Sequence, residues 1–519
     1  MRPMARMNTL SCASVFAMAS VLLGSCAAGP DFTPPDAPDV MSYDYKPLAN
    51  STADGAQDLQ IGQDIPAEWW TLFHSKELNK LVIKAIKENP DLASAEAALR
   101  VAQDNLSAGS AAFFPAASGT FASQRVKTSK DAGGGRSIYT LHSATVGVSY
   151  DLDLWGGTRR SVEKLQAEAA AAQFEKEAAY LALTSNVVTL AITEASLREQ
   201  IAAVEEIVAA QKKVLDVFKL RFNSGAVAKS AVVAQESALA SAEADMPPLQ
   251  HQLAVTRHAL SALIGQMPSN QPEHEFKLSA MSLPKKIPLS LPSRLVAQRP
   301  DVRAAEEQLH AASAAIGIAQ AARLPKITLS ADIGSMAKTF SKLLTPGYGL
   351  WDFGASAAQS LFDAGALANK EQAARDAFDI AAAQYRKTVL AAFREVADAL
   401  HALQSDAESL TLKRNAEKAA NENLTLTQAQ YNAGAVGMAE FLLAQQSSQQ
   451  ARAAAVKAEA QRYADTAALF AALGGGWWNR DAGKTQPVAA GSDVKIKDDG
   501  GNSAEPAPLS TSNLGRRSL

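Results

Sequence analysis

The chain contains almost no cysteine, with only Cys12 and Cys26 among 519 residues. Arg2 and Arg6 precede an apolar run that contains Cys12 and ends just before Cys26, which is the layout of a secretory signal peptide. Removal of residues 1–25 leaves a mature chain of 494 residues that has one cysteine and cannot form an internal disulfide. An exported chain of this size must therefore be held together by packing or by assembly.

The chain also lacks an excess of charge of one sign and a recognisable group of catalytic side chains. The 50 Lys and Arg nearly balance the 53 Asp and Glu, and no long basic block occurs, so nucleic acid is not an expected partner. The seven His residues are scattered without an H-E-x-x-H motif, and no metal site is expected. The glycine triplets that begin at Gly133 and Gly474 lack a following Lys-Ser or Lys-Thr and are not phosphate loops. No nucleophile and base stand together, so we expect no enzyme, no catalytic residue and no cofactor-binding residue.

Aromatic residues and long apolar runs are few. Aromatics make up 6% of the chain, and much of the 47% hydrophobic fraction is Ala. Alanine is a strong helix former with little area to bury, which favours closely spaced helices. After Cys26 no stretch approaches the roughly 18–20 apolar residues of a spanning helix. A part that crosses a membrane would therefore be made of strands.

The end of the signal peptide has a pattern of its own. Leu23-Gly24-Ser25-Cys26 resembles a bacterial lipobox, whose Cys becomes lipidated and then N-terminal. The alternative is an ordinary signal peptide that happens to contain a Cys. By resemblance to sorted lipoproteins, Ala27 rather than Asp after the Cys favours the outer membrane. One lipid anchor binds only marginally, so a second attachment to the membrane is expected.

Two long segments of the chain resemble each other. Four landmarks recur in the same order, with offsets of 209 or 210 positions. They are "NPDLASAEAAL" at Asn89 and "RPDVRAAEEQL" at Arg299, Pro115 and Pro325, "FNSGAV" at 222–227 and "YNAGAV" at 431–436, and "ALIG" ending at Gly265 and "AALG" ending at Gly474. We therefore predict two copies of one unit of about 209 residues.

Each unit predicts the same order of elements. In the first unit, Asn89 and Pro90 begin a helix that runs to about Phe113, and two strands follow. A 65-residue helix from Thr158 to Phe222 leads to the turn, and a last helix spans 228–265. Twelve positions from Leu183 to Phe222 alternate steps of four and three, and ten of them are apolar, which predicts coiled-coil packing.

The strand segments alternate between apolar and polar residues. "SATVGVSYDLDL" alternates from Ala144 to Leu154, and "KITLSADIG" does so from Ile327. Such alternation is typical of a half-buried soluble strand and of a strand in a membrane barrel, and the lipobox favours the barrel. We expect Asp151, Asp153 and Asp332 on the polar strand faces, as lining of a solvated lumen.

The number of strands constrains the assembly. Two units provide four strands, which are too few to close a barrel, and an open edge in lipid leaves backbone groups unpaired. Eight strands from a dimer enclose a filled interior, whereas twelve from a trimer leave a passage. A channel would therefore need the trimer, and the expected fold in that case is an α+β membrane protein with a trimeric 12-stranded β-barrel, four strands per chain.

Seven motifs stand in the order typical of one family. They are "CAAGPDFTPP" at Cys26, "EWWTLF" at Glu68, "NPDLASAEAAL" at Asn89, "DLDLWGGTRR" at Asp151, "LPSRLVAQRPDVRAAE" at Leu291, "YNAGAV" at Tyr431 and "AALGGGW" at Ala471. Together they resemble the outer-membrane efflux protein family, the TolC-like channels, in the lipoprotein branch of tripartite RND-type drug efflux systems. The resemblance covers Cys26 to about Trp478.

The resemblance implies a homotrimer whose barrel continues into a long periplasmic α-helical barrel. Its implied partners are a periplasmic adaptor (membrane fusion) protein, an inner-membrane RND-type transporter and outer-membrane lipid. No cofactor is implied apart from covalent lipid, such as palmitate, on Cys26. The expected segments are a signal peptide (1–25), a lipidated N-terminal and equatorial part (26–88), repeat 1 (89–265), an inter-repeat equatorial segment (266–298), repeat 2 (299–474) and a disordered C-terminal tail (475–519).

The repeated turns are expected at the periplasmic mouth, far from the strands. Turn chemistry alone could explain them, because glycine allows positive φ. The resemblance implies that they also dock the adaptor, through Gly225, Ala226, Val227, Gly434, Ala435 and Val436. It further implies a gate at Glu440, with Leu443 where the family often has Asp, and Lys229 as a partner for Glu440.

The favoured function is a passive exit duct for drugs or other small molecules that the inner-membrane transporter pumps. Within the same class, the alternative is the outer-membrane channel of a type I protein secretion system. From another class, the alternative is a lipid-anchored periplasmic coiled-coil scaffold without a pore.

Overall fold

The structure, a computed structural model, describes residues 27–40, 42–44, 51–127, 138–270 and 275–480. The chain divides into two units, Met1–Trp478 and Asn479–Leu519. Only Asn479 and Arg480 of the second unit are described, and the predicted tail beyond them lies outside the described residues, as does Cys26.

The first half of the chain has the predicted order of elements. Helix α3 (Pro90–Ser110) is followed by the short helix η2 (Ala111–Phe113), strands β2 (Ala116–Lys127) and β3 (Ile138–Leu152), and helices α4 (Gly157–Asn223), α5 (Lys229–Ala244) and α6 (Met246–Leu263). Asn89 caps α3, because its Oδ1 accepts a hydrogen bond from the Leu92 N–H at 2.9 Å.

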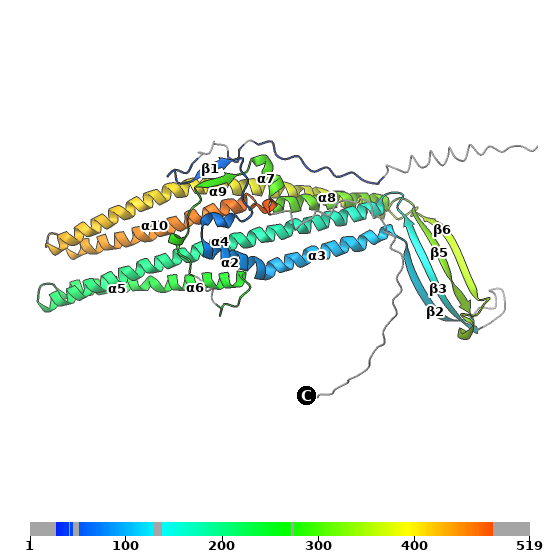
Figure 1. Ribbon diagram of the computed structural model, residues 1–519, viewed down its shortest axis with the longest axis horizontal. Helices are drawn as coiled ribbons and strands as arrows, with labels where there is room; N and C mark the ends of the chain where they lie inside the picture. The colour runs from blue at the N-terminus through cyan, green and yellow to red at the C-terminus, as the bar shows by residue number, and fades with distance from the viewer. Residues whose placement is uncertain (1–26, 41, 45–50, 128–137, 271–274, 481–519) are drawn as a thin grey trace, which may run out of the picture. The chain divides into compact units, whose positions relative to one another are not determined.

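The second half repeats this order. It contains helices α7 (Pro292–Gln298) and α8 (Pro300–Ala321), strand β5 (Lys326–Ala337), the short helix η4 (Phe340–Lys342), strand β6 (Gly349–Ala358), helices α9 (Ala366–Asn432) and α10 (Met438–Ala472), and the short helix η5 (Trp477–Asn479). Helices α4 and α9 each have 67 residues. Both are followed by a short turn and a returning helix, so each half contains one long helical hairpin (Figure 1).

Smaller elements surround the middle of the helices (Figure 1). They are strand β1 (Asp58–Ile61), the short helix η1 (Trp69–Phe73), helix α2 (Lys76–Glu88), the short helix η3 (Leu278–Ala280) and strand β4 (Lys286–Leu289). β1 pairs with β4 in parallel. Trp69, Trp70 and Phe73 of the "EWWTLF" motif are fully buried. The Trp69 and Phe73 rings contact Phe470 and Tyr463 of α10, and the Trp70 ring contacts Tyr180 of α4. The N-terminal segment thus supplies aromatic volume to an otherwise Ala-rich core.

The coiled-coil seam predicted for α4 is largely buried. Leu183, Val187, Leu197, Leu215 and Phe218 are among its buried residues. Glu194, the charged seam position, is also fully buried and pairs with Arg198 at 3.0 Å and with Arg257 of α6 at 3.7 Å. The seam therefore joins α4 to its neighbours by apolar packing and by one buried ionic cluster.

Four strands form one antiparallel sheet in the order β2-β3-β5-β6. The register aligns Gly119, Val146, Ile333 and Trp351 across the sheet. Because aligned residues share a face, one face carries apolar side chains and the other polar ones. The apolar face includes Phe121, Val146, Val148, Leu329, Ile333, Trp351 and Phe353, and the polar face includes Ser118, Thr120, Thr145, Ser149, Asp151, Thr328, Ser330, Asp332 and Asp352.

The sheet and the two hairpin turns lie at opposite ends of the long helices (Figure 1). Trp351 and Phe353 on the apolar face are 78% and 72% exposed. Among the described strands, β2 and β6 each have a neighbour on one side only. The sheet of a single chain therefore has an uncovered apolar face and two open edges.

The predicted strand to Leu154 is too long. β3 ends at Leu152, and the Asp153 carboxylate accepts hydrogen bonds from the N–H groups of Thr158 at 2.8 Å and Arg159 at 3.0 Å. Asp153 therefore satisfies the free amides at the start of α4 and does not line a strand face. Asp363 has the same role at α9, where it accepts from the Leu367 N–H at 2.9 Å.

The predicted single helix over 228–265 is two helices, α5 and α6, which meet at Asp245. Pro247 and Pro248 have no N–H to donate to carbonyl groups of the preceding turn, so the helical hydrogen bonding stops there. Both prolines stand in the first turn of α6, where a missing N–H costs little.

Two further predictions need correction. Among the described helices, α4 alone contains an 18-residue window that is long and apolar enough to span a membrane, so the prediction of no such stretch is too strict. That window is 44% buried, and a core helix passes the same test. The predicted tail begins too early, since Gly475 donates to the Phe470 carbonyl at 2.9 Å and Trp477 Nε1 donates to the Gln298 carbonyl at 2.7 Å.

Candidate functional site

The first hairpin turn follows the end of α4. The Gly225 N–H donates to the Phe222 carbonyl at 2.9 Å and the Ala226 N–H to the Arg221 carbonyl at 2.8 Å, which satisfies carbonyls of the last helical turn. Gly225 has a φ of 77°, and no atom lies within 4 Å of the position that a Cβ would occupy. The backbone conformation, and not crowding, therefore favours glycine at this position.

The second turn has the same hydrogen bonds. The Gly434 N–H donates to the Tyr431 carbonyl at 3.0 Å, the Ala435 N–H donates to the Gln430 carbonyl at 2.9 Å, and Gly434 has a φ of 76°. Of the six turn residues predicted to dock an adaptor, Gly225, Ala226, Gly434 and Ala435 are exposed, whereas Val227 and Val436 are half-buried. The structure brings both turns to one end of the helices (Figure 1).

Three aromatic rings join the two hairpins just behind the turns. Phe218 of α4 stacks on Tyr431 of α9, with ring centroids 5.7 Å apart. Tyr431 stacks in turn on Phe441 of α10 at 5.5 Å, and the Arg221 guanidinium lies 5.8 Å from the Tyr431 ring centroid. We call Phe218, Tyr431 and Phe441 the aromatic stack. The sequence analysis did not assign it, although Phe218 is a seam position and Tyr431 begins the repeated turn motif.

The predicted gate residues lie near the start of α10. Glu440 is exposed, and its carboxylate folds back toward Gly437, since a Cβ added there would lie 2.8 Å from Glu440 Oε2. A negative charge in the first turn of a helix is favourable. Leu443 is 64% exposed. Within the described part of the single chain, no ion pair joins Lys229 to Glu440, and their pairing stays a prediction.

A groove with a cavity of about 760 Å³ lies between the hairpins. Its walls come from α4, from α5 and α6, and from α10, and they include Leu443 beside Leu442 and Val204. Glutamine side chains such as Gln211 and Gln446 line the rest. The Leu443 side chain thus lines the groove between the two hairpins of one chain.

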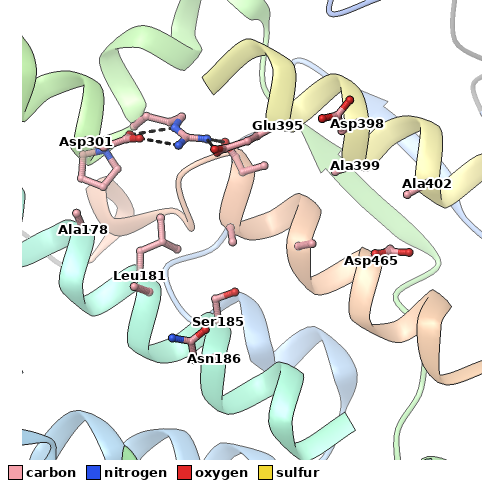
Figure 2. Close-up of a pocket in the computed structure, with 16 residues that line it drawn as sticks. Ala178, Leu181, Ser185, Asn186, Asp301, Glu395, Asp398, Ala399, Ala402 and Asp465 are labelled. Carbon is pink, nitrogen blue, oxygen red and sulfur yellow. Dashed lines mark hydrogen bonds and ion pairs between the residues drawn. The ribbon is translucent and has the colours of Figure 1, made fainter. Parts of the chain in front are cut away.

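A second cavity, of about 580 Å³, lies where α4, α8, α9 and α10 meet (Figure 2). Arg299, which is 8% exposed, donates to the carboxylates of Asp301 at 2.6 Å and Glu395 at 2.8 Å. Burial acts to lower the pKa of Arg299, but the hydrogen bonds and charges of Asp301 and Glu395 outweigh it and raise that pKa. Arg299, Asp301 and Glu395 therefore form a structural ion-pair network.

Arg299 also shows how each hairpin is closed at its base. Arg299 Nη1 donates to the carbonyl of Ala472, the last residue of α10, at 2.9 Å. At the corresponding place in the first half, Asn89 Nδ2 donates to the carbonyl of Leu263, the last residue of α6, at 2.9 Å. Two different side chains thus make the same connection, which explains why Asn89 and Arg299 are landmarks of the repeated pattern.

One pair of carboxyl groups lies between α9 and α10. Burial, followed by the hydrogen bond and the charge of Asp465, raises the pKa of Asp406 to about 7. Arg462 acts in the opposite direction, but it is itself buried and bound to Asp54 of the N-terminal segment. Asp406 is therefore a group of the helical part that titrates near neutral pH.

Among the described residues, no group of three or more His, Cys, Asp or Glu is arranged to hold a metal ion.

A pair of long helical hairpins attached to a sheet with one uncovered apolar face is the arrangement expected of an outer-membrane channel. A model of the outer membrane efflux protein family matches residues 81–266 and 291–475, once in each half. The chain belongs to the outer membrane efflux protein family, which is a family of transport channels and not of enzymes. It is an outer-membrane component of an efflux pump and extends into the periplasm.

Relatives and solved structures agree with this assignment. The chain is 29% identical over 484 residues to the toluene efflux pump outer membrane protein TtgC of Pseudomonas putida, covering 91% of this chain and 97% of TtgC. The outer-membrane channel OprN has a TM-score of 0.80 and 25% identity, covering 87% of this chain and 100% of OprN. The outer membrane protein VceC of Vibrio cholerae has a TM-score of 0.74 and 26% identity, covering 79% of this chain and 99% of VceC.

Proposed function

We propose that three copies of the chain pool their four-stranded sheets into one 12-stranded barrel in the outer membrane. The observation that carries this proposal is the sheet with one apolar face and two open edges. In lipid, open edges leave backbone groups unpaired, and closure through neighbouring chains pairs them. Two copies would give eight strands and a filled interior, whereas three leave a passage lined by the polar face.

The two halves would then serve as structural repeats of one conduit. Each half contributes a helical hairpin with a 67-residue helix, so a trimer would hold six hairpins around a periplasmic tube. The segments 26–88 and 266–298 would form the belt around its middle, and residues 89–265 and 299–474 its walls. In this assembly the polar strand residues Asp151 and Asp332 face the lumen.

The proposed cargo is small molecules, handed over by a periplasmic adaptor and an inner-membrane RND-type transporter. Relatives are named for efflux of toluene, for efflux of antibiotics and for export of pyoverdine, which favours small-molecule export over protein secretion. A lipid-anchored periplasmic coiled-coil scaffold without a pore is disfavoured because it has no use for a sheet with the exposed Trp351 and Phe353.

Specific residues would have specific roles. Cys26 would carry covalent lipid as the second attachment to the outer membrane. Gly225, Ala226, Val227, Gly434, Ala435 and Val436 would dock the adaptor at the periplasmic end. Glu440 and Leu443 would narrow the resting mouth, and Lys229 would pair with Glu440 only across a boundary between chains.

The native mass of protein extracted in detergent from isolated outer membranes tests the assembly. We expect a homotrimer whose chains begin at an acylated Cys26, with ion conductance after reconstitution in planar bilayers. A monomer or dimer without acyl mass would contradict both the barrel and the lipid anchor and would favour the scaffold. A trimer without acyl mass would contradict the anchor alone.

Deletion of the gene tests whether the channel exports small molecules or proteins. We expect deletion of the gene to lower resistance to small toxic compounds without reducing the proteins released into the medium. Loss of a secreted protein with unchanged resistance would instead support the secretion channel.

A further inference from the structure

The apolar face of the sheet becomes basic at the end away from the helices (Figure 1). Side chains two residues apart on a strand share a face, so Ser123, Arg125 and Lys127 of β2 lie on the same face as Phe121. All four residues are exposed. The apolar surface that includes Phe121 is therefore followed by polar and then charged residues before β2 ends at Lys127.

The change occurs at the height where a lipid-facing surface should end. Arg125 pairs with Thr140, which is twelve residues from Leu152, the last residue of β3. At about 3.4 Å per residue and a strand tilt of about 40°, this separation is roughly 31 Å in height. Phe121 pairs with Ala144, which by the same geometry lies roughly 21 Å from Leu152. The apolar band of a membrane barrel is about 25 Å tall, so its edge falls between Phe121 and Arg125.

The short helix η4 packs against this end of the apolar face. The Phe340 ring makes edge-on contacts with Phe121, at 6.1 Å between centroids, and with His142, at 5.8 Å. Phe340 is 64% exposed, and Leu344, which follows η4, is 91% exposed. Lys342, the last residue of η4, is exposed as well. A short segment with exposed apolar and basic side chains is typical of the boundary between a membrane and water.

The cations at this end have no carboxylate partners in the part of the chain that the structure describes. No ion pair joins Arg125, Lys127 or Lys342 to an Asp or Glu there, and neither β2 nor η4 contains an acidic residue. At the end of the sheet next to the helices, by contrast, Lys326 Nζ lies 2.8 Å from the Asp151 carboxylate. The chain thus neutralises a strand lysine at one end, whereas the cations at the other end are available to an anion from outside.

We propose that Arg125, Lys127 and Lys342, which we call the basic margin, bind the phosphate groups of an anionic lipid whose acyl chains cover the apolar face of the sheet. The chain is an outer-membrane protein that extends into the periplasm, so the end of the sheet away from the helices faces the outer leaflet. The inference rests on the proposed barrel, since only a sheet that spans the membrane presents the basic margin to that leaflet.

The chemistry of this surface matches a lipid that carries phosphate. Arg and Lys form charge-assisted hydrogen bonds with phosphate oxygens. A free phosphate ion would pair with the cations but would leave Phe340 and Leu344 uncovered, and a neutral lipid would cover these side chains but leave the cations unpaired. Because β2 is an edge strand, the bound lipid would lie beside the boundary between two chains of the proposed barrel.

Native mass spectrometry of the full-length protein in a neutral detergent tests the proposal. The probe is lipid A, a bisphosphorylated and acylated disaccharide, and the matched ligand is the same lipid after removal of both phosphates. We expect the wild type to bind lipid A more tightly than the dephosphorylated form. Each cation near an anionic lipid contributes about fivefold in affinity, so the triple variant Arg125→Gln, Lys127→Gln and Lys342→Gln should bind lipid A more weakly by on the order of 100-fold. Its affinity for the dephosphorylated lipid should not change.

Lys338→Gln is the matched control variant. Lys338 follows β5 at the same end of the sheet, but its Nζ lies 4.9 Å from the centroid of the Tyr139 ring. Tyr139 pairs with Val126 and therefore belongs to the opposite face, so this variant should bind lipid A as the wild type does. Arg125→Lys keeps the charge and should retain most of the affinity.

The measured masses separate failure of the basic margin from failure of the barrel. A trimer whose triple variant binds lipid A as tightly as the wild type would overturn the basic margin alone, as would a trimer that binds both forms of the lipid equally. Displacement of lipid A by inorganic phosphate at a similar concentration would overturn the assignment to a lipid. A monomer that binds no lipid A would instead contradict the proposed barrel and, with it, the lipid surface that depends on it.

Discussion

Tyr431 is the central ring of the aromatic stack and the point where three helices meet. Phe218 of the first hairpin lies on one side and Phe441 of α10 on the other. The groove opens between the same two hairpins. At the residue scale, Tyr431 is therefore the side chain that connects one hairpin to the other near their turns.

We predict that Tyr431→Ala loosens this end of the channel. Each stacked pair contributes about 0.5–1.5 kcal/mol beyond area burial, so removal of two pairs costs roughly 1–3 kcal/mol. The expected result is faster tryptic cleavage near the turns and a larger single-channel conductance. Tyr431→Phe keeps both ring contacts and should behave as wild type. Equal cleavage rates in the Ala and Phe variants would contradict this role.

We predict that Glu440→Ala opens the resting gate. The carboxylate is exposed at the mouth and would form a ring of three charges in a trimer. Its removal should raise conductance in planar bilayers and lower cation preference. Glu440→Gln, which keeps the size, should lower cation preference with a smaller gain in conductance. A conductance equal to that of wild type in both variants would contradict the gate assignment.

At the element scale, the carboxyl pair between α9 and α10 makes stability depend on pH. The pKa of Asp406 is raised to about 7 in the folded protein, above its ordinary value of 3.8. The folded state therefore holds a proton that the unfolded state has released. Stability should decrease as pH rises from about 4 to about 7 and then become constant.

We predict that Asp406→Asn removes this part of the pH dependence. The amide mimics the protonated acid, so the thermal midpoint, measured by circular dichroism in detergent, should vary less across that range. Asp398→Asn on the same helix is the control, because the Asp398 side chain is 74% exposed. A wild-type slope that persists in the Asp406 variant would contradict the assignment.

The long helices were the most predictable elements. The expected limits Thr158 and Phe222 lie one residue inside the observed Gly157 and Asn223, because apolar periodicity and a glycine turn define both ends. The break at Asp245 was not predicted, since the Ala-rich helical pattern continues on both sides of Pro247.

Side-chain roles at the site were less predictable than the elements. The alternation of apolar and polar residues continues past the end of β3 to Asp153. The Asp153 carboxylate nevertheless accepts a hydrogen bond from the Thr158 N–H and so caps α4. The aromatic stack joins Phe218 to Tyr431, and no local sequence period relates residues so far apart. The partners of the buried Arg299 come from three helices, so only the folded chain identifies them.

At the scale of the whole molecule, the absence of free thiols in the proposed mature chain permits a clean test of barrel closure. Ser118 of β2 and Ser356 of β6 are exposed, lie on the polar face, and belong to the two edge strands. We predict that the double variant Ser118→Cys and Ser356→Cys, treated with a bifunctional thiol reagent, gives covalent dimers and trimers and no larger species. Gel electrophoresis under denaturing conditions measures this.

Single-cysteine variants provide the control. In a ring of three chains, β2 of one chain adjoins β6 of the next, so either cysteine alone should give mostly monomer. A ladder beyond trimers in the double variant would indicate an open assembly. Monomer alone would contradict pairing of these edges.

The contacts of residues 28–32 also bear on the order in which the molecule forms. Arg160 Nε donates to the Ala28 carbonyl at 3.1 Å, the Phe32 ring stacks on His310 with centroids 4.4 Å apart, and a Cβ added to Gly29 would lie 2.4 Å from Gly317 Cα. Arg160 belongs to the first half of the chain, whereas His310 and Gly317 belong to the second. A chain is synthesised from its N-terminus, so Ala28 and Gly29 exist long before the surface that receives them. Residues 28–32 are thus synthesised early and are among the last to reach their native contacts, so these contacts form only when both halves have folded together.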